Sequence, residues 1–190
     1  MSKKVEVTLK DFKVLLCDAD GVFFTGYENR VVIDGSSRVM KTRHHHDGQG
    51  ISFLRGMGIK VLFVTGEGEP MNSIVEKLNQ LPSAKDGTFS TVEIFSDISA
   101  EKTTKEEKID MWLKENGYEW EDCVYIGDDA NDFNAMQKAA VGIAPHDATR
   151  MIKKVADHIL DAKGGEGAIR EFTEMVLDAR GVNEADLPNC

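Results

Sequence analysis

The chain has 190 residues, enough for one domain with a sizeable hydrophobic core. Its 23 Lys and Arg stand against 33 Asp and Glu, a net charge of −10, so it lacks the basic surface that binding to a nucleic-acid backbone needs. Residues 1–13 hold no apolar segment long enough for a signal peptide or a membrane span, and three Cys without a CxxC pair favour a reduced, cytoplasmic protein.

Short apolar runs alternate with amphipathic segments along the chain. From the N-terminus these predict a buried strand at 14–17, a hairpin at 22–33, a helix at 48–57, a strand at 59–64, a helix at 70–78 and a polar loop at 79–91. They continue with strands at 92–95, 123–126 and 141–144, and with helices at 105–116, 132–138, 151–155 and 168–177. Strands separated by helices in this way predict an α/β fold: a Rossmann-like parallel sheet flanked by helices, in one domain over 1–190. No segment is long enough for an inserted cap domain, so the hairpin is the only flap that we expect.

Polar residues follow three of the predicted strands. The first strand runs into Asp18 and Asp20, the second into Thr65 and Gly66, and the strand at 123–126 into the segment GDDAND, residues 127–132. In an open parallel sheet ligands bind beyond the carboxyl ends of the strands, so these groups should meet at one edge. Asp18, Asp20 and Asp128 could there share a hard cation such as Mg²⁺, which prefers oxygen ligands. The plainer alternative is that Asp and Gly only end strands in turns.

These segments resemble a known family. DADGVFFTG, VTG and GDDANDFNAM, in that order, resemble motifs one, two and four of the haloacid dehalogenase superfamily of phosphotransferases. HDGQGISFL, residues 46–54, and LDAKGGEGAIREF, residues 160–172, are similar to segments of its small capless branch, with a C-terminal tail over about 164–190. That branch includes the phosphatases of 3-deoxy-octulosonate 8-phosphate (KDO 8-phosphate) and of nine-carbon, sialic-acid-type nonulosonate 9-phosphates, such as KDN or N-acylneuraminate 9-phosphate. The resemblance implies a Mg²⁺-dependent phosphatase of a phosphorylated 2-keto-3-deoxy sugar acid.

The resemblance also implies roles for single residues. Asp18 would be the nucleophile that forms an aspartyl-phosphate, and Asp20 would protonate the leaving oxygen and then activate water. The carboxylates of Asp18 and Asp128, with the backbone carbonyl of Asp20, would hold Mg²⁺. Thr65 and Gly66 would donate hydrogen bonds to the phosphate. Asp129 and Asp132 would orient the metal's waters and a lysine.

The family needs one lysine beside the phosphate. The segment EKTTKEEK offers Lys102, Lys105 and Lys108, and we favour Lys105 because it opens the helix at 105–116 and its spacing to Gly127 fits the branch. Members often carry Asp before this lysine, whereas Thr104 stands here.

Three further positions bear on the substrate. Glu67 follows Thr65-Gly66 where octulosonate phosphatases commonly have Arg, which suggests a preference for the nonulosonate 9-phosphate. Asp47 and Lys77 are further candidate substrate contacts, although an exposed helix position is the simpler interpretation of Lys77. His44-His45-His46 cannot all face one ion, so a solvated turn, or substrate contact by one histidine near Asp47, is the simpler interpretation of them. The 79–91 loop has no assigned role.

In this branch a homotetramer covers the site, so we expect neighbouring subunits to close it and the aromatic residues at 23, 24 and 27 to serve packing or an interface. Two alternatives stay open. One is a non-catalytic oligomerisation module, related to the domain fused behind sialic acid cytidylyltransferases. The other is a phosphatase of another small phosphate ester.

Overall fold

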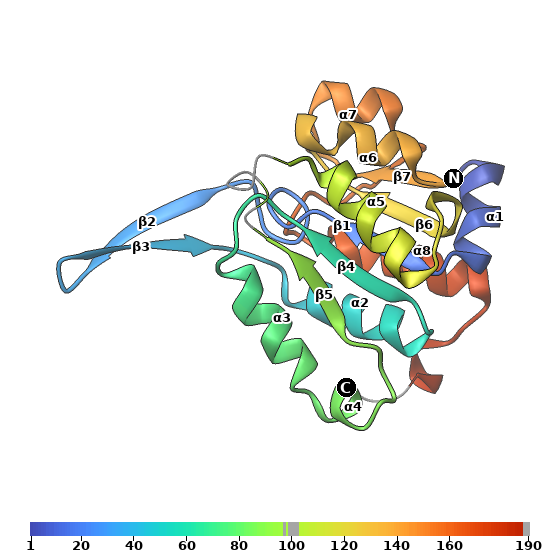
Figure 1. The fold of residues 1–190 in the computed structure, drawn as a ribbon, viewed down its shortest axis with the longest axis horizontal. Helices are drawn as coiled ribbons and strands as arrows, with labels where there is room; N and C mark the ends of the chain where they lie inside the picture. The colour runs from blue at the N-terminus through green and yellow to red at the C-terminus, as the bar shows by residue number, and fades with distance from the viewer. Residues whose placement is uncertain (97, 99–102, 188–190) are drawn as a thin grey trace.

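The computed structural model describes residues 1–96, 98 and 103–187 of the chain. Its centre is a six-stranded sheet with strands in the order β5-β4-β1-β6-β7-β8 (Figure 1). The strands are β1 (Val14–Cys17), β4 (Lys60–Val64), β5 (Val92–Phe95), β6 (Cys123–Ile126), β7 (Val141–Ala144) and β8 (His158–Ile159). All neighbouring pairs are parallel. The predicted Rossmann-like α/β class is therefore confirmed.

Helices cover both faces of the sheet. One face carries α1 (Lys3–Asp11), α2 (His45–Gly56), α3 (Met71–Asn79) and α8 (Ala168–Arg180), and the other carries α5 (Lys105–Asn116), α6 (Phe133–Lys138) and α7 (Arg150–Val155). Because successive side chains of a strand point to opposite faces, Leu15 and Cys17 enter the first core while Val14 and Leu16 enter the second. The polar residues Asp18 and Thr65, which directly follow the carboxyl ends of β1 and β4, are also buried.

The start of α5 is fixed by a capping box. The Thr104 hydroxyl accepts a hydrogen bond from the Glu107 backbone N–H at 3.1 Å, and the Glu107 carboxylate accepts one from the Thr104 backbone N–H at 2.9 Å. Lys105 is consequently the first residue of the helix, which is the position that we expected for it.

The hairpin differs from the prediction in its bounds. It consists of β2 (Glu28–Ile33) and β3 (Ser36–Lys41), joined at Asp34-Gly35, whose φ angles are both positive. Asp-Gly is typical of such tight turns because both residues tolerate positive φ, and this is the turn signal that the expected range of 22–33 missed. Residues 22–24 instead lie buried beside β1, so the packing role expected for the aromatic residues 23 and 24 is the one observed.

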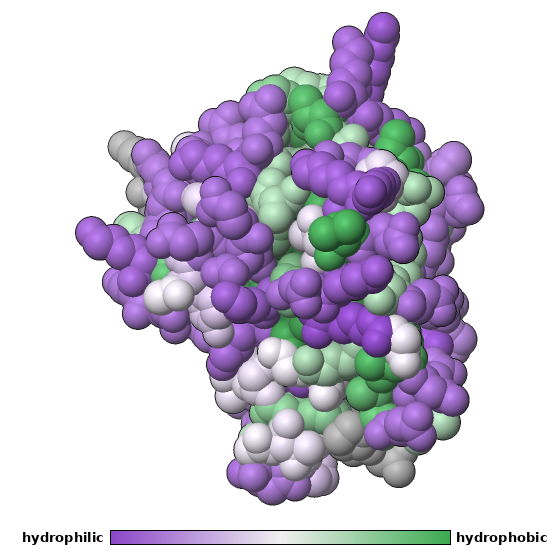
Figure 2. All heavy atoms as spheres, turned by 90° about the vertical axis from the view of Figure 1, so that its right-hand side faces the viewer, coloured by the Kyte–Doolittle hydropathy of each residue, from purple (hydrophilic) through white to green (hydrophobic). Residues whose placement is uncertain are grey.

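The hairpin extends away from the body of the molecule (Figure 1). Its exposed hydrophobic residues are Val32, Ile33, Val39 and Met40, with Tyr27 just before it. The opposite side of the molecule is mostly hydrophilic, with hydrophobic residues in smaller groups between polar ones (Figure 2). The exposed apolar side chains of the hairpin therefore lie on an element that projects from the body instead of packing on the central sheet.

Two helices were not predicted. Helix α1 begins after Ser2, whose hydroxyl caps it, and buries Val5 and Leu9 one turn apart. The 79–91 segment contains the single turn α4 (Pro82–Lys85), with Pro82 as its first residue. Three short 3-10 helices lie at η1 (Trp120–Asp122), η2 (Ala130–Asp132) and η3 (Glu184–Asp186).

Among the helices of the described residues, none combines the length and the apolar character that crossing a membrane requires.

Candidate active site

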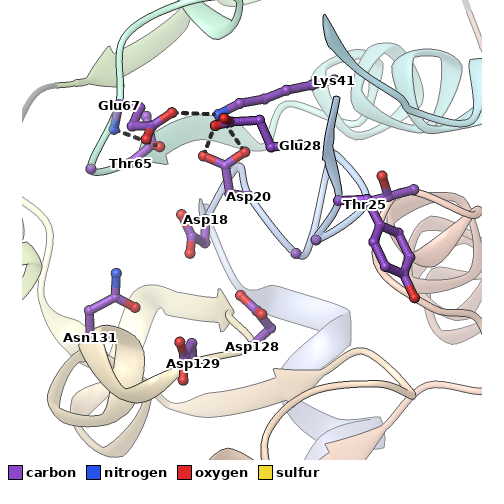
Figure 3. A pocket seen from close by; sticks show the side chains of 14 residues that line it. Asp18, Asp20, Thr25, Glu28, Lys41, Thr65, Glu67, Asp128, Asp129 and Asn131 are labelled. Atoms are coloured by element: carbon purple, nitrogen blue, oxygen red, sulfur yellow. Dashed lines mark hydrogen bonds and ion pairs between the residues drawn. The ribbon is translucent and has the colours of Figure 1, made fainter. Parts of the chain in front are cut away.

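A cavity of about 410 Å³ opens at the carboxyl ends of β1, β4 and β6 (Figure 3). Its lining comprises Asp18, Asp20, Gly21, Thr25, Gly26, Tyr27, Glu28, Lys41, Thr65, Gly66, Glu67, Asp128, Asp129 and Asn131. The three polar strand ends of the sequence are thus brought together at one edge of the sheet, as predicted. Thr65 is buried at the end of β4, and Gly66 lies beside it in the wall.

Lys105 connects two buried carboxylates behind this cavity. Its Nζ lies 2.7 Å from Asp18 Oδ2 and 2.8 Å from Asp132 Oδ1, and all three side chains are buried. Burial lowers the pKa of Lys105, but the charges of Asp18 and Asp132 more than offset this and raise it to about 12. Lys105 is therefore a fixed cation beside Asp18, the position that the motif-three lysine was expected to hold. Lys102 lies outside the described residues.

Both carboxylate oxygens of Asp132 accept hydrogen bonds and so link Lys105 to the loop after β6. Oδ1 accepts from the Tyr125 hydroxyl at 2.6 Å as well as from Lys105, and Oδ2 accepts from the backbone N–H groups of Asp128 and Asp129 at 3.0 and 3.1 Å. Asp132 thereby fixes both Lys105 and the loop that carries Asp128. The Tyr125 hydroxyl is a supporting group that the sequence reasoning missed, because it lies within a buried strand.

Asp128, unlike Asp132, has a carboxylate oxygen without a partner. Its Oδ1 is buried and accepts no hydrogen bond. Burial, followed by the charge of Asp132, raises the pKa of Asp128 to about 7. Oxygen atoms of Asp18, Asp128 and Asp132 lie within 4.8 Å of one another, the one such group found among the described residues that could hold a metal ion. An unpaired carboxylate oxygen beside a second buried carboxylate fits a hard divalent cation.

Asp18 is held in place from two sides. Its Oδ1 accepts a hydrogen bond from the Ala19 backbone N–H at 2.7 Å, while Oδ2 contacts Lys105. Burial raises the pKa of the Asp18 carboxyl well above its ordinary value, and Asp132 adds to this effect while Lys105 opposes it.

The glycine-rich tail packs directly on the loop after β1. The Gly165 backbone N–H donates to the Val22 carbonyl at 2.8 Å. A Cβ on Gly164 would lie 1.8 Å from the Gly21 carbonyl oxygen, and one on Gly165 would lie 2.0 Å from the Thr25 nitrogen. Only glycine allows this approach, which explains the GGxGA segment as a support for the loop that carries Asp18.

A second lysine, which the sequence reasoning missed, lies at the mouth of the cavity. Lys41 Nζ lies 2.7 and 2.8 Å from the two carboxylate oxygens of Asp20 and 2.9 Å from Glu67 Oε2 (Figure 3). Glu67 thus lines the cavity as predicted, but its carboxylate pairs with Lys41.

Other candidate residues lie elsewhere. Asp47 is fully buried outside the cavity and accepts hydrogen bonds from the Gly167 and Arg170 backbone N–H groups at 3.2 and 2.9 Å, so it caps α8. This placement speaks against the expected substrate contact, since no part of Asp47 faces the cavity. Lys77 lines a different hollow, together with His45. His44 caps α2, and its ring contacts that of His46.

The comparisons with known proteins agree with this geometry. Residues 6–172 match the family model of the haloacid dehalogenase-like hydrolases. The 3-deoxy-D-manno-octulosonate 8-phosphate phosphatase of Haemophilus influenzae is 30% identical over 173 residues, 91% of this chain and 87% of that protein. An N-acylneuraminate cytidylyltransferase of Oncorhynchus mykiss is 25% identical over 166 residues, 87% of this chain but 35% of that protein. The structure of the Moraxella catarrhalis octulosonate 8-phosphate phosphatase with magnesium, phosphate and KDO superposes with a TM-score of 0.78, at 25% identity, covering 95% of this chain and 94% of that one.

Proposed function

Because the chain belongs to the haloacid dehalogenase-like hydrolases and is a phosphatase of that family, we propose that it hydrolyses the phosphate monoester of a 2-keto-3-deoxy sugar acid in a Mg²⁺-dependent reaction. The observation that carries the proposal is the buried Asp18 carboxylate, which contacts Lys105 at 2.7 Å and has an oxygen within 4.8 Å of one of Asp128, a residue whose Oδ1 is buried without a partner. Such a site suits the binding of an anionic ester together with a metal ion. The lysine supplies positive charge beside the nucleophile, and the unpartnered carboxylate oxygen can bind the metal.

The residues present fit a divalent cation. Asp18 and Asp128 would hold it with their carboxylates and Asp20 with its backbone carbonyl, while Asp132 fixes the loop that carries Asp128. When bound, Mg²⁺ supplies positive charge that offsets the charge on Asp18 and on the phosphoryl group. Asp132 is a poor direct ligand, because Lys105, Tyr125 and two backbone N–H groups already use its oxygens.

The chain's own residues divide the reaction into two displacements. The Asp18 carboxylate attacks phosphorus, the bond from phosphorus to the sugar oxygen breaks, and Asp20 gives that oxygen a proton. Water then attacks the aspartyl-phosphate, Asp20 takes the proton of the water, and Asp18 leaves as a carboxylate. The Thr65 hydroxyl and the Gly66 backbone N–H donate to the phosphate oxygens, and Lys105 keeps Asp18 in position.

The eight-carbon and nine-carbon sugar acids are separate candidates. The relatives named octulosonate 8-phosphate phosphatases make the eight-carbon ester the first candidate. The nonulosonate 9-phosphate stays a prediction that rests on Glu67. The pairing of Glu67 with Lys41 weakens it, because the carboxylate already has a partner.

Phosphate release from both esters tests the proposal. We expect turnover of at least one sugar acid phosphate with Mg²⁺, loss of turnover with a chelator, and none for Asp18→Asn, which keeps the shape of the nucleophile but not its charge. Asp178→Asn serves as the control for loss of a carboxylate, because Asp178 is exposed on α8 and does not line the cavity. Turnover by Asp18→Asn at the wild-type rate would contradict the mechanism, and failure on both esters with activity on another phosphate would contradict the substrate class.

We also propose that the chain forms a homotetramer through the hairpin. An isolated two-stranded hairpin is marginally stable, and this one exposes Val32 to 75% and carries further apolar residues. Light scattering after size exclusion should give the mass of four chains, and Val32→Lys combined with Met40→Lys should reduce it. The control is Val7→Lys, because Val7 is an exposed apolar residue of α1. A wild-type monomer would contradict this proposal.

A non-catalytic assembly module is less well supported. The cytidylyltransferase relative makes this alternative reasonable. A module without chemistry has no need of a buried Lys105 between two carboxylates, which costs desolvation energy to maintain. The Asp18→Asn comparison decides between the two, because a module would show no activity to lose.

A further inference from the structure

The ammonium group of Lys41 is held by two carboxylates at once. Nζ donates hydrogen bonds to Asp20 Oδ2 and Glu67 Oε2, and it also forms an ion pair with Asp20 Oδ1, all at 2.9 Å or less. Nζ also lies 5.8 Å from the centre of the Phe24 ring. The Lys41 side chain is 5% exposed, whereas those of Asp20 and Glu67 are 39% and 61% exposed. Lys41 is therefore the fixed member of the group, and it restrains two carboxylates that solvent would otherwise leave mobile.

The orientation of Asp20 follows from this contact. In Figure 3 its carboxyl group is turned toward Lys41 and Glu67, while Asp18 and Asp128 lie on the other side of it. The side with Glu67 is the open one, because Glu67 is the most exposed member of the group and Asp18 is buried. An in-line attack by Asp18 places the leaving oxygen on the far side of phosphorus, toward this opening. An acid that serves that oxygen has to stand where Lys41 holds Asp20.

We propose that Lys41 is a positioning residue that holds the Asp20 carboxylate on the leaving-group side of the cavity, with Glu67 and Phe24 holding Lys41. This inference rests on the proposed function, since it assigns Lys41 to the acid of that reaction. Lys41 transfers nothing: the proton passes between Asp20 and the leaving oxygen or water, and the ammonium group stays protonated throughout.

The experiment uses the leaving group to isolate the role of Asp20. A p-nitrophenyl phosphate needs little protonation of its leaving oxygen, whereas the alkoxide of a sugar phosphate needs a proton. We therefore measure leaving-group release in a single turnover, which precedes the water step that Asp20 also serves. We expect Lys41→Met to slow this release about 100-fold for octulosonate 8-phosphate and for glucose 6-phosphate, the cost of a misplaced catalytic group, and less than about threefold for p-nitrophenyl phosphate. Asp20→Asn should show the same selectivity, and Lys41→Arg should recover part of the alkyl ester activity because it can still bind both carboxylates.

Lys138→Met is the matched control. Lys138 also pairs with two carboxylates, those of Glu106 and Asp110, and lies 5.5 Å from the Trp120 ring, but outside the cavity. Lys138→Met should leave the rates for the two sugar phosphates unchanged relative to the rate for p-nitrophenyl phosphate. Thermal unfolding of each variant reports whether the fold is intact.

Three results would overturn the inference. An equal loss on all three esters would assign Lys41 to phosphate binding or to the fold. A raised KM for the sugar acid alone would assign it to the substrate carboxylate. If the wild-type protein turns over none of the esters, the proposed function is wrong, and this inference falls with it. The wild-type protein is therefore assayed before any variant is made.

Discussion

Replacing Asp128 by Asn should stabilise the metal-free protein. The unfolded chain releases the Asp128 proton near its ordinary pKa of 3.8, whereas the folded protein holds it until about pH 7. Between these values the folded state binds more protons, so its free energy of unfolding falls as the pH rises. Asn has the same shape and no charge to desolvate, so the variant escapes this loss.

The size of the effect follows from the two pKa values. The difference between 3.8 and about 7 corresponds to about 4 kcal/mol at ~1.4 kcal/mol per pKa unit, and this cost is complete once the pH exceeds 7. For a chain of this length 1 kcal/mol moves Tm by roughly 2–4 °C. In chelator at pH 8 we therefore expect the Tm of Asp128→Asn to exceed that of the wild type by roughly 8–16 °C, and at pH 5 by less than half of that amount.

Thermal unfolding with chelator at pH 5 and pH 8, followed by the same scans with Mg²⁺, measures this. Mg²⁺ should raise the Tm of the wild type by mass action and that of Asp128→Asn much less. Asp129→Asn should leave Tm nearly unchanged, because Asp129 is exposed. If Asp128→Asn unfolds at or below the wild-type temperature at pH 8, or if its advantage does not shrink at pH 5, then the acidic cluster is not under the electrostatic strain that we infer.

Two further substitutions test the supports of the site. Lys105→Met should lower the free energy of unfolding by about 3–5 kcal/mol in urea titrations, because it leaves Asp18 and Asp132 buried without their cation; a change below about 1 kcal/mol would contradict the buried pairing. Gly164→Ala should abolish activity or soluble expression, since its Cβ would lie within 2 Å of a backbone oxygen, whereas Gly26→Ala, with no atom within 4 Å of its Cβ, should behave as the wild type; equal behaviour of the two would refute the close approach.

The buried parts of the site could be predicted because local signals specify them. Apolar runs give the strands, and the polar residue after a strand must lie at the sheet edge, which places Asp18, Thr65 and Asp128. Lys105 is favoured among three lysines because it opens a predicted helix, and the Thr104–Glu107 capping box accounts for that start in the structure. These features need no knowledge of how distant segments meet.

The mouth of the cavity could not be predicted in this way. Lys41 reaches Asp20 from 21 positions along the chain, and only because β3 returns to the body of the molecule at its last residue. An error in the bounds of the hairpin removed that lysine from consideration. The role of Asp47 was missed for the same kind of reason, because its hydrogen-bond partner Gly167, at the start of α8, lies 120 positions further along the chain. Contacts of this range depend on the assembled fold.

The contact between the tail glycines and the loop after β1 also bears on how the protein is made. Residues 21–25 leave the ribosome well before Gly164 and Gly165, the residues on which they pack. A chain that stops at residue 163 would contain all six strands and every acid and lysine of the site, yet its nucleophile loop would lack its support. The loop after β1 can therefore reach its final packing only after these two glycines have been synthesised.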